Sequence, residues 1–161
     1  MLHLGIDPGL ARIGFALIEK TSDTIRVVDF GVITTAPGPT LESRLTQLRQ
    51  DLESILSSRE ITSAGVEKLF FETNVKTAMD VAQARGVIIE YIHSHGIPII
   101  HLTPLEVKAE LTGDGSADKR QVMDMLKLIF GTTFTAKFDD AADALAIAYI
   151  AAMREGKNIE T

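Results

Sequence analysis

The segment LHLGIDPG, residues 2–9, decides the fold because it defines the first strand and the point where that strand ends. Apolar residues at positions 2, 4 and 6 alternate with His3, Gly5 and Asp7, which is the two-residue period of a β-strand. The Pro-Gly pair that follows is a turn signal, so the strand ends on the carboxylate of Asp7.

The next strands extend this first one into a sheet. The segments IGFALIEK (13–20) and TIRVVDFGVITT (24–35) read as strands joined by a short polar loop, which predicts a three-stranded antiparallel meander. Further along, SAGVEKLFF (63–71) begins as a buried strand and IPIIHL (97–102) is a short one.

Helical patterns separate and follow these later strands. Helices are expected over 41–55, 75–94, 104–113, 116–130 and 140–154. Thr40, Asn74 and Ser116 are the expected N-caps. Strands that alternate with helices predict parallel pairing with helices on both faces. The sequence therefore predicts an α/β fold with a mixed five-stranded sheet, as one domain over residues 1–161 with a flexible tail at 155–161.

Composition excludes several classes of protein. The chain has no cysteine, which excludes disulfides and thiolate metal sites and is compatible with a reducing, cytoplasmic setting. No secretory signal is expected, and the apolar run from Ala141 is too short for a membrane span. The net charge of −6 argues mildly against nucleic acid, although net charge does not describe a local patch.

Two carboxylates stand at the ends of predicted strands, where ligands gather in open α/β sheets. Asp7 ends the first strand, and Glu67 ends the apolar part of the fourth. Each has a simpler explanation: Asp7 can belong to a turn, and Glu67 can pair with Lys68. A buried, unpaired carboxylate would cost several kcal/mol, so Glu67 needs a partner in either case.

Three more carboxylates begin the last helix, in FDDAADALAIAYI (138–150). An N-cap role for Asp139 and a favourable helix dipole for Asp140 would explain two of them. Neither effect explains Asp143, which lies further along among alanines. Spacings of three and four residues would place Asp143 on the same helix face as Asp140 and Asp139.

These acids are more economically explained together than one at a time. Asp7, Glu67, Asp140 and Asp143 all need neutralising charge, and lysines are not interleaved among them. Carboxylate oxygens suit Mg²⁺ or Mn²⁺, and the four histidines form no ligand pattern that would compete. Four carboxylates suit two such ions about 3.5–4 Å apart, the arrangement that cuts phosphodiesters.

Several motifs occur in register with the predicted elements: GIDPG (5–9), VEKLF (66–70), QARG (83–86), GSADKRQV (115–122) and DAADALA (140–146). With them the chain resembles the RuvC family of Holliday junction resolvases, within the ribonuclease H-like superfamily. The resemblance implies that Asp7, Glu67, Asp140 and Asp143 form a catalytic, metal-binding tetrad. It leaves Asp139 a capping or surface role.

The same resemblance implies a set of DNA contacts. Phe70 matches an aromatic residue that inserts at the opened junction, and Asn74 falls in the segment that meets DNA near the cleavage point. Lys108 and Lys119 match positions that contact backbone phosphate. Arg85 and Arg120 add to a basic face on an otherwise acidic protein, and binding to such a face would depend strongly on salt.

The implied activity is resolution of four-way DNA junctions in recombination and repair, in the cytoplasm of a bacterium. Two symmetric phosphodiester cleavages would depend on Mg²⁺, with Mn²⁺ able to substitute, and would leave 5′-phosphate and 3′-hydroxyl ends. The family also implies a homodimer and a branch-migration helicase as partner, with no membrane involved.

Three other functions remain to be weighed. A ribonuclease H-like nuclease could act on another nucleic acid, such as precursor RNA, because a fold alone does not fix function. A sugar-kinase or actin-like ATPase also begins with a GIDPG-like loop, but it needs two related domains. A non-catalytic DNA-binding module would have no use for four clustered carboxylates that repel one another.

Overall fold

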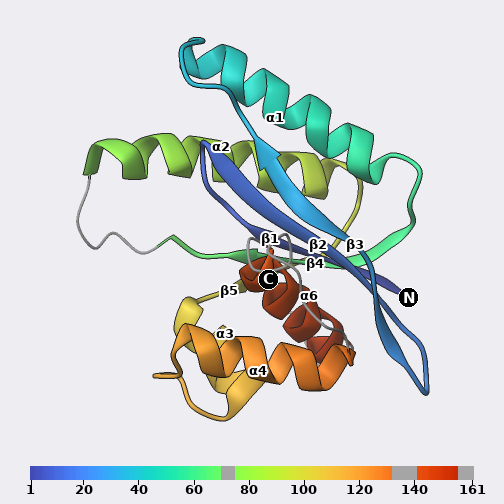
Figure 1. Ribbon diagram of the computed structural model, residues 1–161. Helices are drawn as coiled ribbons and strands as arrows, with labels where there is room; N and C mark the ends of the chain where they lie inside the picture. The colour runs from blue at the N-terminus through green and yellow to red at the C-terminus, as the bar shows by residue number, and fades with distance from the viewer. Residues whose placement is uncertain (70–74, 132–140, 156–161) are drawn as a thin grey trace.

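A mixed five-stranded sheet, in the order β3-β2-β1-β4-β5, lies at the centre of the fold (Figure 1). The structure is a computed structural model that describes residues 1–69, 75–131 and 141–155. β2 pairs antiparallel with both β1 and β3, which confirms the predicted meander, and β1 pairs parallel with β4, which confirms the mixed sheet. The strands are β1 (Leu2–Asp7), β2 (Arg12–Lys20), β3 (Ile25–Thr34), β4 (Ile61–Glu67) and β5 (Ile99–Leu102).

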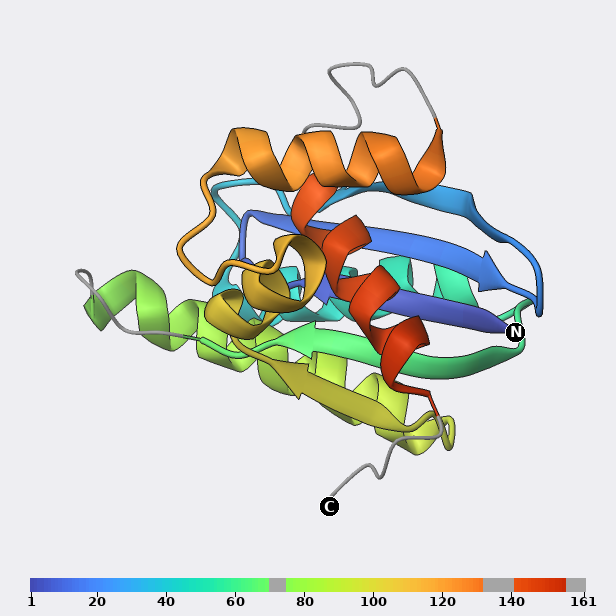
Figure 2. The same ribbon diagram turned by 90° about the horizontal axis from the view of Figure 1, so that it is seen from below.

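Helices cover both faces of the sheet, as predicted. Figures 1 and 2 show α1 (Leu41–Leu56) and α2 (Val75–Ser94) on one face. The other face carries α3 (Pro104–Thr112), α4 (Lys119–Phe130) and α6 (Ala142–Arg154). Within the described part of the chain, none of these helices has the combination of length and apolar character that crossing a membrane requires.

Strand alternation decides which side chains face which layer of helices. Leu4 and Ile6 of β1, like Ala64 and Val66 of β4, belong to the apolar core that includes residues of α1 and α2. Successive side chains of a strand point to opposite faces, so the intervening residues point toward α6. Asp7 and Glu67 are the last residues of their strands on this α6 face.

Two glycines let α6 lie directly on the sheet, where it crosses β1, β2 and β4 (Figure 2). A Cβ atom at Gly5 would overlap the backbone of Ala144 and Ala148. At Gly65 it would lie 2.9 Å from the carbonyl oxygen of Ile147. Glycine inside a strand commonly marks such close backbone contact. The first turn of α6 is thereby held close to the ends of β1 and β4.

Two strand boundaries differ from the sequence prediction. β4 begins at Ile61 rather than at 63, because its register with β1 begins at the Leu2–Ile61 pair, and it ends at Glu67 as the sequence indicated. β5 begins at Ile99 rather than at 97. Pro98 has no amide hydrogen, although its carbonyl accepts a hydrogen bond from the Ala64 amide, so it flanks the strand.

Helices α1, α2 and α3 begin where the sequence predicted, and Thr40 caps α1 as predicted, whereas the starts of α4 and α6 differ. The N-cap of α4 is Asp118 and not Ser116, because Asp118 and Gln121 form a reciprocal capping box. Ser116 instead donates to the Asp114 side chain. The described helix α6 begins at Ala142, with Ala141 rather than Asp139 as N-cap.

Some predicted features fall outside the described residues: Asn74 as a cap, Phe70, Asp139, Asp140 and positions 156–161 of the expected tail. Glu155, the first residue of that expected tail, is described, and its carboxylate lies 3.4 Å from His3 Nε2. The extent of a flexible tail and the single-domain organisation stay predictions.

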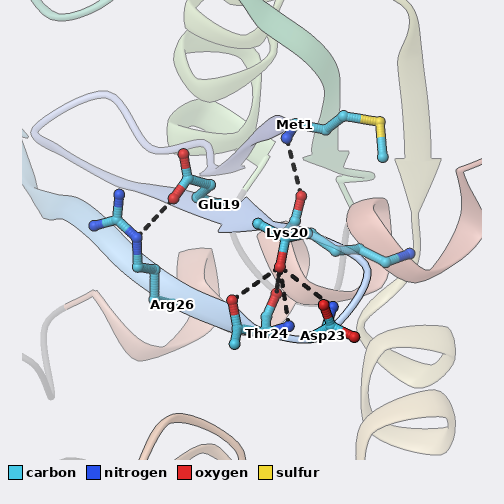
Figure 3. Close-up of polar contacts among 7 residues, drawn as sticks. Met1, Glu19, Lys20, Asp23, Thr24 and Arg26 are labelled. Carbon is cyan, nitrogen blue, oxygen red and sulfur yellow. Dashed lines mark hydrogen bonds and ion pairs between the residues drawn. The ribbon is translucent and has the colours of Figure 1, made fainter.

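The end of the sheet far from Asp7 is tied together by polar contacts around the β2–β3 hairpin (Figure 3). The amino terminus of Met1 donates to the carbonyl of Lys20, and Arg26 pairs with Glu19 at 2.6 Å. Lys20 also reaches the carbonyl of Ala152 at the end of α6. These contacts fix the C-terminal end of α6 against the sheet.

His3 is fully buried at this end and should make stability depend on pH. Its Nδ1 lies 2.9 Å from the Ser63 hydroxyl. Burial lowers the pKa of His3; the charge of Glu155 opposes this, while the Met1 amino terminus and Lys20 reinforce it. The unfolded state therefore takes up protons first as the pH falls below about 6.5, and folding stability is lost.

Replacing His3 with Asn should remove this part of the pH dependence. We expect the wild type to lose about 1 kcal/mol more stability than His3→Asn between pH 7.5 and 5, because only the wild type must keep an imidazole neutral. Urea denaturation at both pH values measures the difference. A wild type that gains stability relative to the variant on acidification would show that the Glu155 ion pair outweighs burial.

Candidate functional site: a carboxylate cluster at the ends of β1 and β4

The structure brings together the three predicted carboxylates that it describes. Asp7 and Glu67 follow the paired residues Ile6 and Val66 on neighbouring parallel strands, so they end those strands side by side. Asp143, in the first turn of α6, acts electrostatically on both. Three distant parts of the sequence therefore meet at one edge of the sheet.

The cluster holds excess negative charge. Burial raises the pKa of Glu67 to about 8, with Asp7 and Asp143 contributing in the same direction. Glu67 thereby keeps a proton, which it donates in a hydrogen bond to Asp7. Burial and the charge of Asp143 raise the pKa of Asp7, while the hydrogen bond from Glu67 opposes them. Near neutral pH, Glu67 loses this proton readily only when a cation takes its place.

A pocket of about 190 Å³ opens on this cluster between β4, α3, α4 and α6. Glu67 and Asp143 supply its acidic side, and Lys108 of α3 supplies a cation. Its remaining lining is apolar: Pro104, Val107, Val122 and Ala146. The pocket thus combines oxygen ligands for a hard cation with an ammonium group that can bind an anion.

The donor set fits a divalent metal ion in its chemistry. Carboxylate oxygens are the ligands that Mg²⁺ and Mn²⁺ prefer. In the described ranges 1–69, 75–131 and 141–155, no group of three or more acidic or histidine side chains is arranged so that it could hold a metal ion by itself. Two of the carboxylates share a proton with each other instead, and the fourth predicted ligand, Asp140, falls outside these ranges.

The surroundings of Glu67 do not fit the simpler explanation, an ordinary salt bridge with Lys68. Lys68 is exposed, and its amide donates to the carbonyl of Leu102. The charges that shift the pKa of Glu67 are those of Asp7 and Asp143, without a contribution from Lys68. Among the described residues, the neighbours of Glu67 therefore resemble a metal site more than an ordinary ion pair.

The predicted DNA-contacting residues lie in different settings. Lys108 lines the pocket itself. Lys119 and Arg120 are exposed at the start of α4, and Arg120 lies 3.9 Å from Asp124. Arg85 is half-buried and bonded to protein groups, whereas Phe70 and Asn74 fall outside the described residues.

Sequence reasoning missed contacts that hold the site together. His101, one of the four histidines that form no ligand pattern in the sequence, accepts a hydrogen bond from the guanidinium of Arg85 beside the end of β4. Arg154 forms a bidentate pair with Glu110 and lies 3.5 Å from Glu106, so it links α6 to α3. The i, i+4 spacing of Glu106 and Glu110 could have predicted an acidic helix face that binds a cation, but this spacing does not identify Arg154 as the partner.

A mixed sheet in this strand order, with carboxylates at the ends of β1 and β4 and at the start of a helix that crosses them, defines a ribonuclease H-like nuclease fold. Comparisons with known proteins identify the family within this class of nucleases. The chain belongs to the RuvC family: residues 3–151 match the family described as crossover junction endodeoxyribonuclease RuvC.

Individual relatives agree with this assignment. The crossover junction endodeoxyribonuclease RuvC of Chloroflexus aggregans is 44% identical over 92% of this chain and 90% of its own length. The Thermus thermophilus RuvC structure is 28% identical, with a TM-score of 0.86 over 96% of this chain and 95% of that one. T. thermophilus RuvC in complex with Holliday junction substrate also has a TM-score of 0.86, at 28% identity over 97% and 96% of the two chains.

Proposed function

We propose that this chain is a structure-specific endonuclease that resolves four-way DNA junctions. It would hydrolyse two symmetrically placed phosphodiesters and leave 5′-phosphate and 3′-hydroxyl ends, in recombination and repair. The observation that carries the proposal is the clustering of Asp7, Glu67 and Asp143 beside a pocket that Glu67 and Asp143 line, in a chain of the RuvC family. The relatives' names favour this substrate over another nucleic acid such as precursor RNA.

The family is one of metal-dependent nucleases, and the cluster supplies suitable ligands. Asp7, Glu67, Asp140 and Asp143 would hold two Mg²⁺ ions, for which Mn²⁺ would substitute. Bound divalent ions would supply charge stabilisation beyond that of Lys108 and would lower the pKa of a bound water molecule. The high pKa of Glu67 means that this residue must give up its proton before it can act as a ligand.

The protein's own groups would orient the DNA. Lys108, in the same pocket as Glu67 and Asp143, would bind a phosphate oxygen next to the carboxylates and keep the scissile group from being repelled. The apolar side chains of Val107, Val122 and Ala146 would exclude water from the opposite wall.

Residues outside the pocket would hold the junction arms. Lys119 and Arg120 are exposed at the start of α4, where they can reach backbone phosphates. Phe70 would stack on an unpaired base at the opened junction, and Asn74 would contact DNA near the cleavage point. A homodimer would present two sites to the two equivalent strands of a two-fold junction. The protein would act in the cytoplasm of a bacterium, together with a branch-migration helicase.

Cutting should require both the junction and a divalent ion. We expect the protein to bind a synthetic mobile four-way junction in EDTA and to cut it into paired nicked duplexes only with Mg²⁺ or Mn²⁺, because the ligands are all carboxylates. Gel products from the junction and from linear duplex of the same sequence measure this. Equal cutting of linear duplex would show that the enzyme is not specific for four-way junctions. Junction binding without cutting in any divalent ion would show that the protein is not a nuclease.

A further inference from the structure

Arg85 lies on the face of the sheet opposite the carboxylate pocket. Its helix, α2, packs on the face to which Val66 points, whereas Glu67 points toward α6. The Arg85 side chain nevertheless reaches the end of β4, where its Nε donates to the main-chain carbonyl of Glu67 at 2.8 Å. Arg85 therefore touches the backbone of a pocket residue from behind.

The end of β4 needs such a donor. β1 ends at Asp7, and the following Pro8 has no amide hydrogen with which to continue the ladder beside β4. On the other side, the amide of Lys68 still bonds the carbonyl of Leu102 on β5. A side chain that satisfies the Glu67 carbonyl fixes the last residue of the strand where the backbone pairing runs out.

His101 on β5 orients the Arg85 side chain. Nη2 of Arg85 lies 2.9 Å from His101 Nδ1. A guanidinium can only donate, so Nδ1 must be the acceptor and the imidazole is neutral, with its hydrogen on Nε2. Burial lowers the pKa of His101, and the charges of Arg85 and Lys68 act in the same direction. The guanidinium is thus held at two points, the Glu67 carbonyl and the His101 ring.

We infer that Arg85, oriented by His101, is a positioning residue that holds the Glu67 carboxylate in place for metal binding, and that it is not a phosphate contact. This inference rests on the proposed function, because it assigns Glu67 as a metal ligand. Residues that fix the orientation of a ligand typically change metal affinity or activity by about 10–100-fold when they are replaced.

Arg85→Gln separates a positioning role from a DNA contact. We expect the affinity for Mn²⁺ without DNA, measured by electron paramagnetic resonance, to fall about tenfold, and cutting at saturating junction to fall about 10–100-fold. Junction binding in EDTA should stay within about twofold of wild type, with an unchanged salt dependence. Arg26→Gln, an exposed arginine at the far end of the sheet, is the matched control.

The opposite pattern would overturn the inference. Weaker junction binding, with the slope of log K against log salt smaller by about 1 and Mn²⁺ affinity unchanged, would make Arg85 a phosphate contact. Arg85→Lys tests the two roles further, because lysine keeps the positive charge but lacks the planar guanidinium that donates to two partners at once. A positioning role predicts that Arg85→Lys resembles Arg85→Gln, whereas a phosphate contact predicts nearly normal cutting.

Variants of His101 test the second point of attachment without changing Arg85. His101→Asn keeps an acceptor near the place of Nδ1 and should retain most Mn²⁺ affinity, whereas His101→Leu removes it and should lose affinity as Arg85→Gln does. Equal behaviour of the two His101 variants would contradict the orienting role. A wild type that binds Mn²⁺ but cuts no junction would disprove the proposed function alone, since the Mn²⁺ measurements still decide the role of Arg85.

Discussion

Asp7→Asn should abolish junction cutting and, in the same protein, raise the stability of the metal-free fold. The loss of cutting follows from removing one carboxylate of the cluster, a change that costs several kcal/mol of charge stabilisation and so about 10³-fold or more in rate. Junction binding in EDTA should be unchanged. Loss of activity that accompanies a gain in stability separates a functional residue from a structural one.

The gain in stability follows from the repulsion within the cluster. Burial and the charge of Asp143 raise the pKa of Asp7, and the pKa of Glu67 rises to about 8. For such a group, stability is complete below the unfolded pKa near 4.5 and is lost as the pH rises through about 8. Asp7→Asn removes one of the interacting charges, so its advantage in EDTA should be small at pH 5 and largest near pH 9.

Thermal unfolding in EDTA at both pH values measures this advantage. We expect about 1 kcal/mol near pH 9, which is about 2–4 °C in a domain of this size. Asp23→Asn, on the exposed β2–β3 turn, is the matched control and should change neither stability nor cutting. An Asp7→Asn protein that is less stable than wild type in EDTA would indicate a structural role, and one that still cuts would remove Asp7 from the ligands.

The sequence alone was sufficient to find the described carboxylates, for a definite physical reason. Asp7 and Glu67 each follow an apolar strand, and the ends of parallel strands share one edge of a sheet. Asp143 was identifiable because a helix that begins at 140 would leave it beyond the capping positions and among alanines, although the structure places it in the first turn of α6. Each residue has an ordinary explanation by itself, and the prediction came from requiring one cause for all of them.

The start of the last helix is only partly comparable with the prediction. The described helix begins at Ala142 rather than at 140, and the predicted shared face of Asp140 and Asp143 stays a prediction because Asp140 lies outside the described residues. The N-cap of α4 is a different case, because Ser116 and Asp118 are both good N-caps but only Asp118 has Gln121 three residues later to complete a capping box. That spacing is a local sequence signal, so this cap could have been predicted from the sequence.

The direction in which long side chains point was also not predictable from the sequence. Arg85 was assigned to a basic face by its charge, yet its described hydrogen bonds join it to Glu67 and His101 within the protein. Lys108 was assigned to phosphate by resemblance, and it lies at the pocket with Glu67 and Asp143. Charge counts cannot distinguish these two settings, because the outcome depends on which strand end lies under each helix.

The contact of α6 with the sheet should make Gly5 the most sensitive position outside the carboxylates. A Cβ at this residue would overlap backbone atoms of Ala144 and Ala148, so no rotamer change relieves it, and α6 itself must move. Moving α6 also moves Asp143 away from Asp7 and Glu67. At Gly65 the nearest atom is the Cγ2 of Ile147, 2.7 Å away, so part of the strain can be relieved by a side chain.

We therefore expect Gly5→Ala to lose about 3 kcal/mol of stability and to cut junctions far less than its folded fraction allows, with Gly65→Ala affected less in both respects. Chemical denaturation gives the stability, and single-turnover cutting at a temperature where the variant is folded gives the activity. Gly86→Ala is the matched control, because open space surrounds that helical position and alanine favours a helix by about 1 kcal/mol.

If the Gly5→Ala variant does not fold, Gly65→Ala still tests the prediction. Gly65→Ala must lose Mn²⁺ affinity together with cutting if the contact of α6 with the sheet sets the distance between Asp143 and the ends of β1 and β4. Normal stability and cutting in both variants would show that α6 tolerates displacement from the sheet, and that the carboxylates assemble without this contact.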